Sequence, residues 1–431
     1  MLKSSRVLFQ CLSKHIEVTV RTALVTRKVS AFSPNRKCQY HKSADKMDIL
    51  FCDYDFVGFD LDCTLCEYHV SDMARMEYDV MADFLIGRGY PSDKLKLGLD
   101  GFGLDFIQRG LILDFQRGNV LKLDRNGGIM KATHGTKVLD PEVTVEVYGR
   151  RTTNCPFLAR IKENMLSAWE PDCRSRYRLL LDYFDFPAGL AFARCVDHFD
   201  ERGETDFTKC GEDTLAVLRY MYNRDHFADG RSEYFKRMRA EPSKYIRRSD
   251  PRLIVWLRNL HRKKRTFLIT GSNCDLADFV ATHSLGPDWR DLFDVVVCFA
   301  NKPFFFTERR PYLSVTNDLK EGQPTENLSL PGIFSQGNWA DLAHLFCVNL
   351  NKPEARGLYF GDNLVQDVFT PLKFGCCDTV AVVEEKNEDH PSREAVHSEF
   401  WGAMHARGSW WGNVIEIYAK ASIPSMNALP R

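Results

Sequence analysis

The chain has 431 residues, of which 44% are hydrophobic, so it can bury a large core and divide into two or three structural units. Lysine plus arginine equals aspartate plus glutamate, at 58 residues each, and this balance argues against binding to nucleic acid or an anionic membrane through bulk charge. No apolar run approaches the roughly 18 to 20 residues that cross a bilayer. The 14 cysteines have no repeating spacing, which favours reduced thiols.

The first 46 residues differ from the rest of the chain. They are basic, contain several serines and are poor in acidic residues. This composition is typical of a mitochondrial transit peptide, and the other interpretation is a disordered leader before an alternative start at Met47. We therefore expect a cytoplasmic protein, or a mitochondrial one if the leader is a targeting signal.

A short apolar strand over residues 56–59 leads directly into Asp60 and Asp62. In extended backbone, residues two apart point in the same direction, so the two carboxylates converge and require a cation. An EF-hand loop needs glycine at its sixth position and glutamate at its twelfth. Leu65 and Asp72 stand at those places, which excludes that calcium site. The Cys-X-X-Cys pair inside this motif lacks the context of a redox or zinc site.

Helical and β-type patterns follow this strand. Apolar spacing predicts a helix over about residues 72–88, and glycine turns between residues 109 and 128 predict a small β meander. From about residue 157 to 251 the spacing is again helical. We therefore predict an inserted, mainly helical cap that includes the meander. The predicted division is a leader over 1–46, a catalytic core over 47–85 and 251–420, a cap over 86–250 and a tail over 421–431.

Three more apolar runs predict buried strands at residues 266–269, 292–299 and 357–360, with helices between them and a polar surface hairpin or loop over 317–331. This alternation is typical of an α/β fold with a central parallel sheet, whose ligands bind beyond the carboxyl ends of the strands. With the first strand, these runs place polar residues just past their last apolar positions: Asp60 and Asp62, Thr270, Lys302, and Asp362.

This set of motifs resembles that of the haloacid-dehalogenase phosphohydrolase superfamily. The matching residues are Asp60-Leu-Asp-Cys-Thr, Thr270, Lys302 and Gly361-Asp-Asn-Leu-Val-Gln-Asp367. The resemblance implies a Rossmann-like core with its cap inserted between the first and second motifs. It also implies roles: Asp60 as nucleophile, Asp62 as general acid and base, Thr270 and Lys302 as phosphate ligands, and Asp367 as the acid that orients the lysine or a metal-bound water.

The implied cofactor is Mg²⁺, held by Asp60, Asp62 through its main-chain carbonyl, and Asp362. Elementary chemistry agrees with these roles. An aspartate nucleophile splits hydrolysis into formation and breakdown of an aspartyl-phosphate. A second carboxyl group can protonate the leaving oxygen and then take a proton from water. A lysine and a hydroxyl can balance the charge on the transferring phosphoryl group.

Further motifs narrow the resemblance to the cytosolic purine 5′-nucleotidase family, over roughly residues 53–378. They are Arg109-Gly-Leu, Gly118-Asn-Val-Leu-Lys-Leu-Asp, His134-Gly-Thr, Tyr183-Phe-Asp-Phe-Pro, Lys302-Pro-Phe-Phe-Phe and Ser335-Gln-Gly-Asn. This implies a Mg²⁺-dependent hydrolase of nucleoside 5′-monophosphates. One departure is Gly271, where well-characterised members carry asparagine, and it removes a polar side chain beside the phosphate or ribose.

Several residues allow two interpretations. Arg178, Asp182 and Asp185 could face a base or ribose, or they could be solvated charges of the cap. Core packing is favoured over base stacking for residues 304–306, and a structural role is favoured for His134. For the whole protein, the alternatives are a nucleotide-binding or interaction protein with little turnover, and a nucleoside phosphotransferase with the same active-site residues. The expected partner is a nucleotide or other phosphomonoester, with neither nucleic acid nor membrane.

Overall fold

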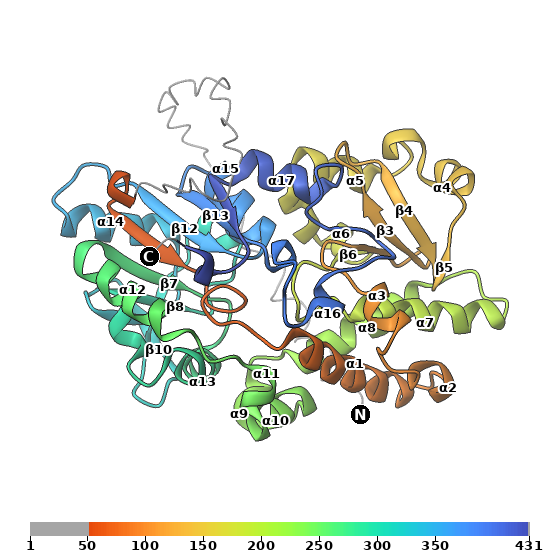
Figure 1. Ribbon diagram of the computed structural model, residues 1–431, viewed down its shortest axis with the longest axis horizontal. Coiled ribbons are helices and arrows are strands. Elements are labelled where there is room, and N and C mark those ends of the chain that lie inside the picture. The colour runs from red at the N-terminus through yellow and green to blue at the C-terminus, as the bar shows by residue number, and fades with distance from the viewer. Residues whose placement is uncertain (1–50, 430–431) are drawn as a thin grey trace, which may run out of the picture. The chain divides into compact units, whose positions relative to one another are not determined.

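A nine-stranded sheet forms the core of the protein (Figure 1). The computed structural model describes residues 51–429, and the predicted leader lies outside the described residues. In order across the sheet, the strands are β10 (Glu321–Thr325), β9 (Tyr312–Val315), β11 (Gly332–Gln336), β8 (Val295–Cys298), β7 (Arg265–Ile269), β1 (Phe56–Phe59), β12 (Gly357–Gly361), β13 (Asp378–Val382) and β14 (Ala421–Ile423). All neighbours from β11 to β14 pair in parallel, and the β9–β10 hairpin is antiparallel.

Helices cover both faces of this sheet. Alternate residues of a strand point to opposite faces, so Phe267 and Ile269 pack with α14 (Trp339–Asn349), while Leu268 packs in the cluster that contains the apolar sides of α12 (Pro251–Lys263) and α13 (Cys274–Leu285). The helices of the core are α12 (Pro251–Lys263), α13 (Cys274–Leu285), α14 (Trp339–Asn349), α15 (Thr370–Lys373) and α17 (Trp410–Tyr418). The predicted α/β core with its mostly parallel sheet is thus confirmed.

Local sequence explains where α12 begins and which side it buries. Asp250 caps it by accepting a hydrogen bond from the Arg252 N–H over 2.8 Å, and Pro251 occupies the first turn, where the missing N–H costs nothing. Its buried residues are Leu253, Leu257 and Leu260, which lie on one helical face. The helix is followed almost at once by β7, so its packing helps to fix the position of Thr270 at the end of that strand.

The cap lies between β1 and β7 in the sequence and combines many helices with a small sheet. The five-stranded antiparallel sheet has the order β5 (Lys137–Val138), β4 (Ile129–His134), β3 (Asn119–Leu123), β2 (Ile112–Asp114) and β6 (Tyr177–Leu179). The longer helices are α1 (Val70–Ile86), α4 (Pro141–Tyr148), α5 (Pro156–Glu163), α7 (Ala188–Glu201), α8 (Thr208–Met221) and α10 (Glu233–Ala240). The shorter ones are α2 (Ser92–Leu95), α3 (Phe102–Phe106), α6 (Pro171–Arg174), α9 (Asp225–Asp229) and α11 (Pro242–Tyr245).

The structure differs from the predicted division at three places. Helix α1, expected in the core, packs against α7 and α8 of the cap. The short helix α16 (Arg393–Val396), also expected in the core, contacts α1 and α3. Residues 421–423, expected in a tail, form β14 beside β13. Apolar spacing shows that an element buries one face, but it does not tell which neighbour covers that face.

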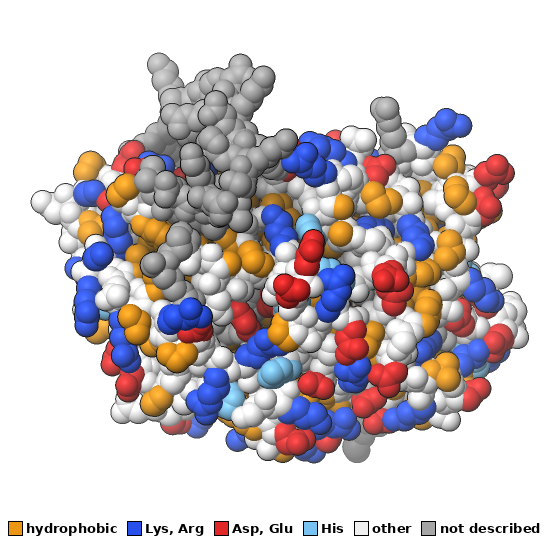
Figure 2. All heavy atoms as spheres, in the orientation of Figure 1, with side chains coloured by type: hydrophobic (Ala, Val, Ile, Leu, Met, Phe, Trp, Pro, Cys, Tyr) orange, Lys and Arg blue, Asp and Glu red, His pale blue; other side chains and the backbone are white. Residues whose placement is uncertain are grey.

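Charged side chains of both signs are interspersed over the face of the molecule in Figure 2, and no large area of one sign is visible there. This mixture agrees with the equal numbers of basic and acidic residues in the sequence. Among residues 51–429, no helix combines the length and the apolar composition that a membrane span requires.

Candidate active site

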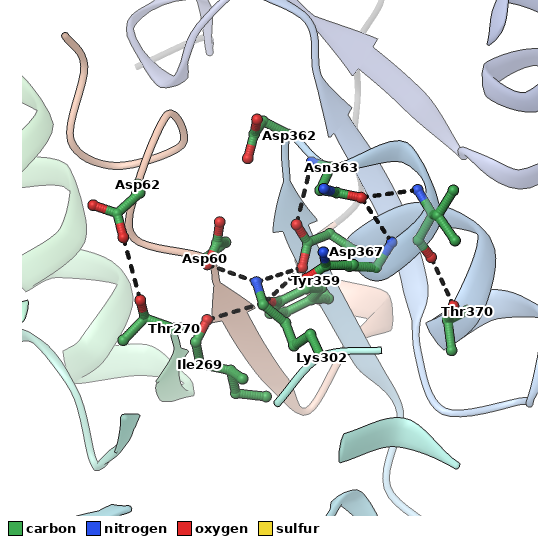
Figure 3. Close-up of polar contacts among 12 residues, drawn as sticks. Asp60, Asp62, Ile269, Thr270, Lys302, Tyr359, Asp362, Asn363, Asp367 and Thr370 are labelled. Carbon is green, nitrogen blue, oxygen red and sulfur yellow. Dashed lines mark hydrogen bonds and ion pairs between the residues drawn. The ribbon is translucent and has the colours of Figure 1, made fainter. Parts of the chain in front are cut away.

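The predicted site residues meet at the carboxyl end of the parallel strands (Figure 3). Asp60 directly follows β1, and its N–H donates to the Phe360 carbonyl over 2.8 Å, which extends the pairing with β12 by one residue. Thr270 and Asp362 directly follow β7 and β12 and are buried. Lys302 lies on the loop after β8. Parallel strands therefore bring these residues to one edge of the sheet.

Lys302 joins two carboxylates. Its Nζ donates to Asp60 Oδ1 over 2.7 Å and to Asp367 Oδ1 over 2.6 Å. Two residues of its loop have the left-handed backbone that is uncommon outside glycine, Phe299 with φ 45° and Asn301 with φ 54°. Burial disfavours a charged lysine, but Asp367 and Asp60 outweigh that effect and raise the pKa of Lys302. The ammonium group therefore stays charged beside Asp60.

Three buried aspartates form an acidic cluster. Asp60, Asp362 and Asp367 each offer a carboxylate oxygen within 4.8 Å of the others. Burial raises the pKa of all three, that of Asp60 to about 8, and neighbouring carboxylates add to the shift. A bound cation would relieve this cost, and carboxylate oxygens are the ligands that Mg²⁺ prefers. The donor set thus fits the predicted cofactor, and Asp367 contacts the lysine directly.

The Asp62 side chain is held apart from this cluster. Its Oδ1 accepts from the Tyr68 hydroxyl over 2.6 Å, and its Oδ2 accepts from Ser272 Oγ over 2.8 Å. The Thr270 hydroxyl lies 3.4 Å from the same Oδ2. Tyr68 and Ser272 were absent from the predicted site. Ser272 could have been found, since it follows Thr270 by two residues at the same strand end, whereas nothing in the local pattern marks Tyr68.

Arg109 of the cap also reaches the site. Its Nη1 donates to Asp362 Oδ2 over 2.7 Å, while its Nε and Nη2 donate to the two oxygens of Glu385 over 2.8 Å each. The guanidinium lies 4.2 Å from the centre of the Tyr183 ring. Burial disfavours the ionised form of Glu385, but Arg109 lowers its pKa below the ordinary value. The sequence predicts Arg109 only as part of a motif, because its partners Asp362 and Glu385 lie far along the chain.

Similarity to known proteins extends over most of the chain. The model of the 5′ nucleotidase family matches residues 49–399. The chain belongs to this family. It is 35% identical over 347 residues to 5′-nucleotidase domain-containing protein 1 of Homo sapiens, which covers 79% of this chain and 73% of that protein. It is 30% identical over 332 residues to 5′-nucleotidase domain-containing protein 2 of Rattus norvegicus. This match covers 74% of this chain and 55% of the rat protein. The predicted family is confirmed, and the protein is an enzyme of the phosphatase class.

In this member of the 5′-nucleotidase family, one of the three predicted cap residues touches the site. Asp182 accepts a hydrogen bond from Asn363 Nδ2 over 2.8 Å, and Asn363 directly follows Asp362. Arg178 and Asp185 instead pair with each other over 2.6 Å. Asp182 is therefore placed at the edge of the site, while the other two charges neutralise each other in the cap.

Other residues singled out in the sequence of this 5′-nucleotidase family member have contacts that fit a structural role. Phe305 and Phe306 are buried in the core cluster, as predicted, whereas Phe304 is half-buried and lies outside it. His134 contacts Asn119 over 2.8 Å and Asp200 over 3.0 Å. Burial raises the pKa of the Cys63 and Cys66 thiols well above the ordinary value, and neither thiol belongs to a possible metal cluster among the described residues.

Gly271 has open space around it. A Cβ atom added there would meet no heavy atom within 4 Å. The residue lies between Thr270 and Ser272, whose hydroxyl groups both face Asp62. The site therefore has room at the position where the family carries a polar side chain.

Proposed function

We propose that the protein is a Mg²⁺-dependent phosphohydrolase that removes phosphate from nucleoside 5′-monophosphates through an aspartyl-phosphate on Asp60. The observation that carries the proposal is the contact of Lys302 with Asp60 and Asp367, two of the three members of the acidic cluster. Family membership supports the nucleotide as substrate.

The proposed location is cytoplasmic, or mitochondrial if the leader directs import, and imaging a fusion of residues 1–46 would decide between them.

The proposed reaction has two steps. A carboxylate oxygen of Asp60 forms a bond to phosphorus while the bond to the ester oxygen breaks, and Asp62 gives that oxygen a proton. Asp62 then takes a proton from the water that attacks phosphorus and releases Asp60. Its contacts with Tyr68 and Ser272 hold its carboxyl group in one orientation for both transfers.

Positive charge supports both steps. Lys302 and the Thr270 hydroxyl would contact the transferring phosphoryl group, whose oxygens carry negative charge in the transition state. Mg²⁺, held by Asp60, the main-chain carbonyl of Asp62, and Asp362, would supply further positive charge and allow Asp60 to ionise. Asp367 would keep Lys302 directed at Asp60, as its 2.6 Å contact with the ammonium group supports.

Phosphate release from a panel of nucleoside 5′-monophosphates, with and without Mg²⁺, tests the proposal. Asp60→Asn should lower turnover by at least about 10³-fold, as loss of a nucleophile does elsewhere. Asp318→Asn, at an exposed residue of the β9–β10 hairpin, is the matched control and should leave turnover unchanged. Equal turnover by wild type and Asp60→Asn would overturn the mechanism. Nucleotide-dependent stabilisation without phosphate release would favour the binding protein, and new phosphorylated products with added nucleosides would favour phosphotransfer.

A further inference from the structure

The chain crosses between core and cap twice, and the two crossings lie side by side. Tyr68 of the outgoing crossing forms an antiparallel bridge with Ile246 of the returning one. The His69 N–H donates to the Tyr245 carbonyl over 2.8 Å, and the Arg247 N–H donates to the Glu67 carbonyl over 2.9 Å. A cavity of about 540 Å³ opens beside this pair. We call it the junction cavity; residues of both crossings and of the first turn of α1 line it.

The start of α1 offers hydrogen-bond donors to this cavity. His69, at the N-cap position, makes no capping hydrogen bond with its side chain. The first amides of a helix have no partner within the helix and carry partial positive charge. Ser71 lines the cavity and is 8% exposed, yet its hydroxyl has no hydrogen-bond partner among the described residues. A buried, unpartnered hydroxyl beside an uncapped helix start points to a ligand with acceptor oxygens.

Two arginines of the returning crossing line the same cavity. Arg247 donates from Nε to the Tyr68 carbonyl over 3.1 Å, and within residues 51–429 neither Arg247 nor Arg248 forms an ion pair with a carboxylate. Their charge acts on nearby histidines. Burial is the largest cause that lowers the pKa of His69, and the charge of Arg247 is the second. Burial and then the charge of Arg248 lower the pKa of His283 in the same way. Both guanidinium groups are therefore available to an anion.

The cavity wall also carries three acidic residues, and the charge of Arg247 lowers the pKa of one of them, Glu67, against the larger opposite effect of burial. Glu394 accepts from Arg75 over 2.9 Å, and Glu67 accepts from Asn427 Nδ2 over 3.3 Å. Asp72 is exposed. The donors left for a ligand are the two guanidinium groups, the Ser71 hydroxyl and the first amides of α1.

We propose that the junction cavity binds a small phosphate-bearing anion, whose phosphoryl oxygens contact Arg247, Arg248, Ser71 and the start of α1. Guanidinium groups and helix N-termini are the usual phosphate ligands of proteins. The volume lies within the range of small-molecule sites, so the cavity can hold inorganic phosphate or a phosphomonoester of nucleotide size. None of the residues that line it belongs to the acidic cluster at Asp60.

The cavity is linked to the reaction through Tyr68. This residue stands between Glu67 and His69, two wall residues, and its hydroxyl donates to Asp62 over 2.6 Å. If the proposed function holds, a ligand that fixes the two crossings also fixes Tyr68 and, through it, the orientation of Asp62. Occupancy of the junction cavity is therefore expected to change kcat more than KM.

Direct binding tests the site without turnover. The probes are inorganic phosphate and a non-hydrolysable nucleoside 5′-phosphonate, measured by equilibrium dialysis on the full chain carrying Asp60→Asn, with Mg²⁺ present. Two classes of site are expected. Arg247→Gln with Arg248→Gln should weaken one class by about tenfold or more, as the loss of charge-assisted hydrogen bonds does, and leave the other unchanged. Arg252→Gln is the matched control, because this exposed arginine pairs with Asp250 outside the cavity.

The outcomes separate the ligand sources and can overturn the site. Tighter binding of phosphate to the affected class identifies inorganic phosphate as the ligand, and tighter binding of the phosphonate identifies a nucleotide-type ligand. A single class in the parent chain, or two classes that the double substitution leaves unchanged, overturns the proposal. If the double variant does not fold, two single variants replace it in the binding measurement: Arg248→Gln, at an exposed residue, and Ser71→Ala. Absence of phosphate release by wild type is scored in a separate assay and rejects only the proposed function.

Discussion

Arg109 and Asp362 are joined over 2.7 Å, and this contact connects the cap to the carboxyl end of β12. Glu385 engages the other side of the guanidinium group with both of its oxygens. The three side chains are only 2% to 6% exposed. The contact uses one oxygen of Asp362, while the other makes no hydrogen bond among the described residues. Arg109 thus orients a proposed metal ligand and leaves it an oxygen for the metal.

Removing Arg109 should destabilise the fold strongly. Arg109→Met leaves two buried carboxylates without their partner, so the free energy of unfolding should fall by about 3–5 kcal/mol. Urea unfolding measures the change. Arg356→Met is the control, since its exposed pair with Asp378 should contribute about 0–1 kcal/mol. A loss below about 1 kcal/mol for Arg109→Met would show that the buried pair matters no more than a surface pair.

Metal binding should change how stability depends on pH. Burial raises the pKa of Asp60 to about 8 without metal, so the folded chain keeps a proton that the unfolded chain releases above about pH 4. Asp60 therefore lowers stability as the pH rises from about 4 towards 8. In EDTA, wild type should lose stability relative to Asp60→Asn over this range, on the order of a few kcal/mol. Mg²⁺ should reduce this loss, because it favours the ionised carboxylate; a pH-independent difference in EDTA would contradict the prediction.

The Tyr68 hydroxyl should matter for turnover. Tyr68→Phe removes the 2.6 Å hydrogen bond to Asp62 and leaves the ring in place. We expect kcat to fall about 10- to 100-fold, with little change in KM, because a misplaced proton donor slows the chemical step rather than binding. Steady-state kinetics test this, with Tyr220→Phe as the control, since that hydroxyl binds the Arg231 carbonyl within the cap. Equal kcat values for both variants would show that Tyr68 does not position Asp62.

Gly271 should affect substrate choice more than stability. The open space around it can accept the side chain of Gly271→Asn. Because this amide would stand beside the phosphate and ribose, the ratio of kcat/KM values between two nucleotides should change by about tenfold. Gly271→Ala fills the space without the polar group and should keep the wild-type ratio. If the two variants give the same ratio, volume rather than hydrogen bonding controls selectivity at this position.

The site residues that directly follow a strand could be predicted from the sequence. The residues that contact and orient them could not. Asp60, Thr270 and Asp362 each follow an apolar run, and the carboxyl ends of parallel strands necessarily meet. Arg109 is different, because its partners Asp362 and Glu385 lie 253 and 276 residues further along the chain. No local periodicity records such a pairing, since it depends on how the cap docks on the core.

The same reason explains why the neighbours of some elements differ from those that the predicted division implies. The apolar stripe of α1 is plain in the sequence, but only the tertiary arrangement assigns it to α7 and α8 of the cap. The three-residue strand β14 is too short for a periodic signal, and its place beside β13 comes from sheet pairing.

The position of β1 also has a consequence for how the chain folds. Phe56 pairs with Arg265 of β7 on one side and with Gly357 of β12 on the other. The apolar strand that delivers Asp60 therefore leaves the ribosome long before either neighbour has been made. Pairing between strands that are distant in the sequence slows folding. Until the later strands are made, the apolar surface of β1 is exposed and prone to aggregation. We expect nascent chains that stop before β7 to expose β1 and to associate with chaperones until the later strands enclose it.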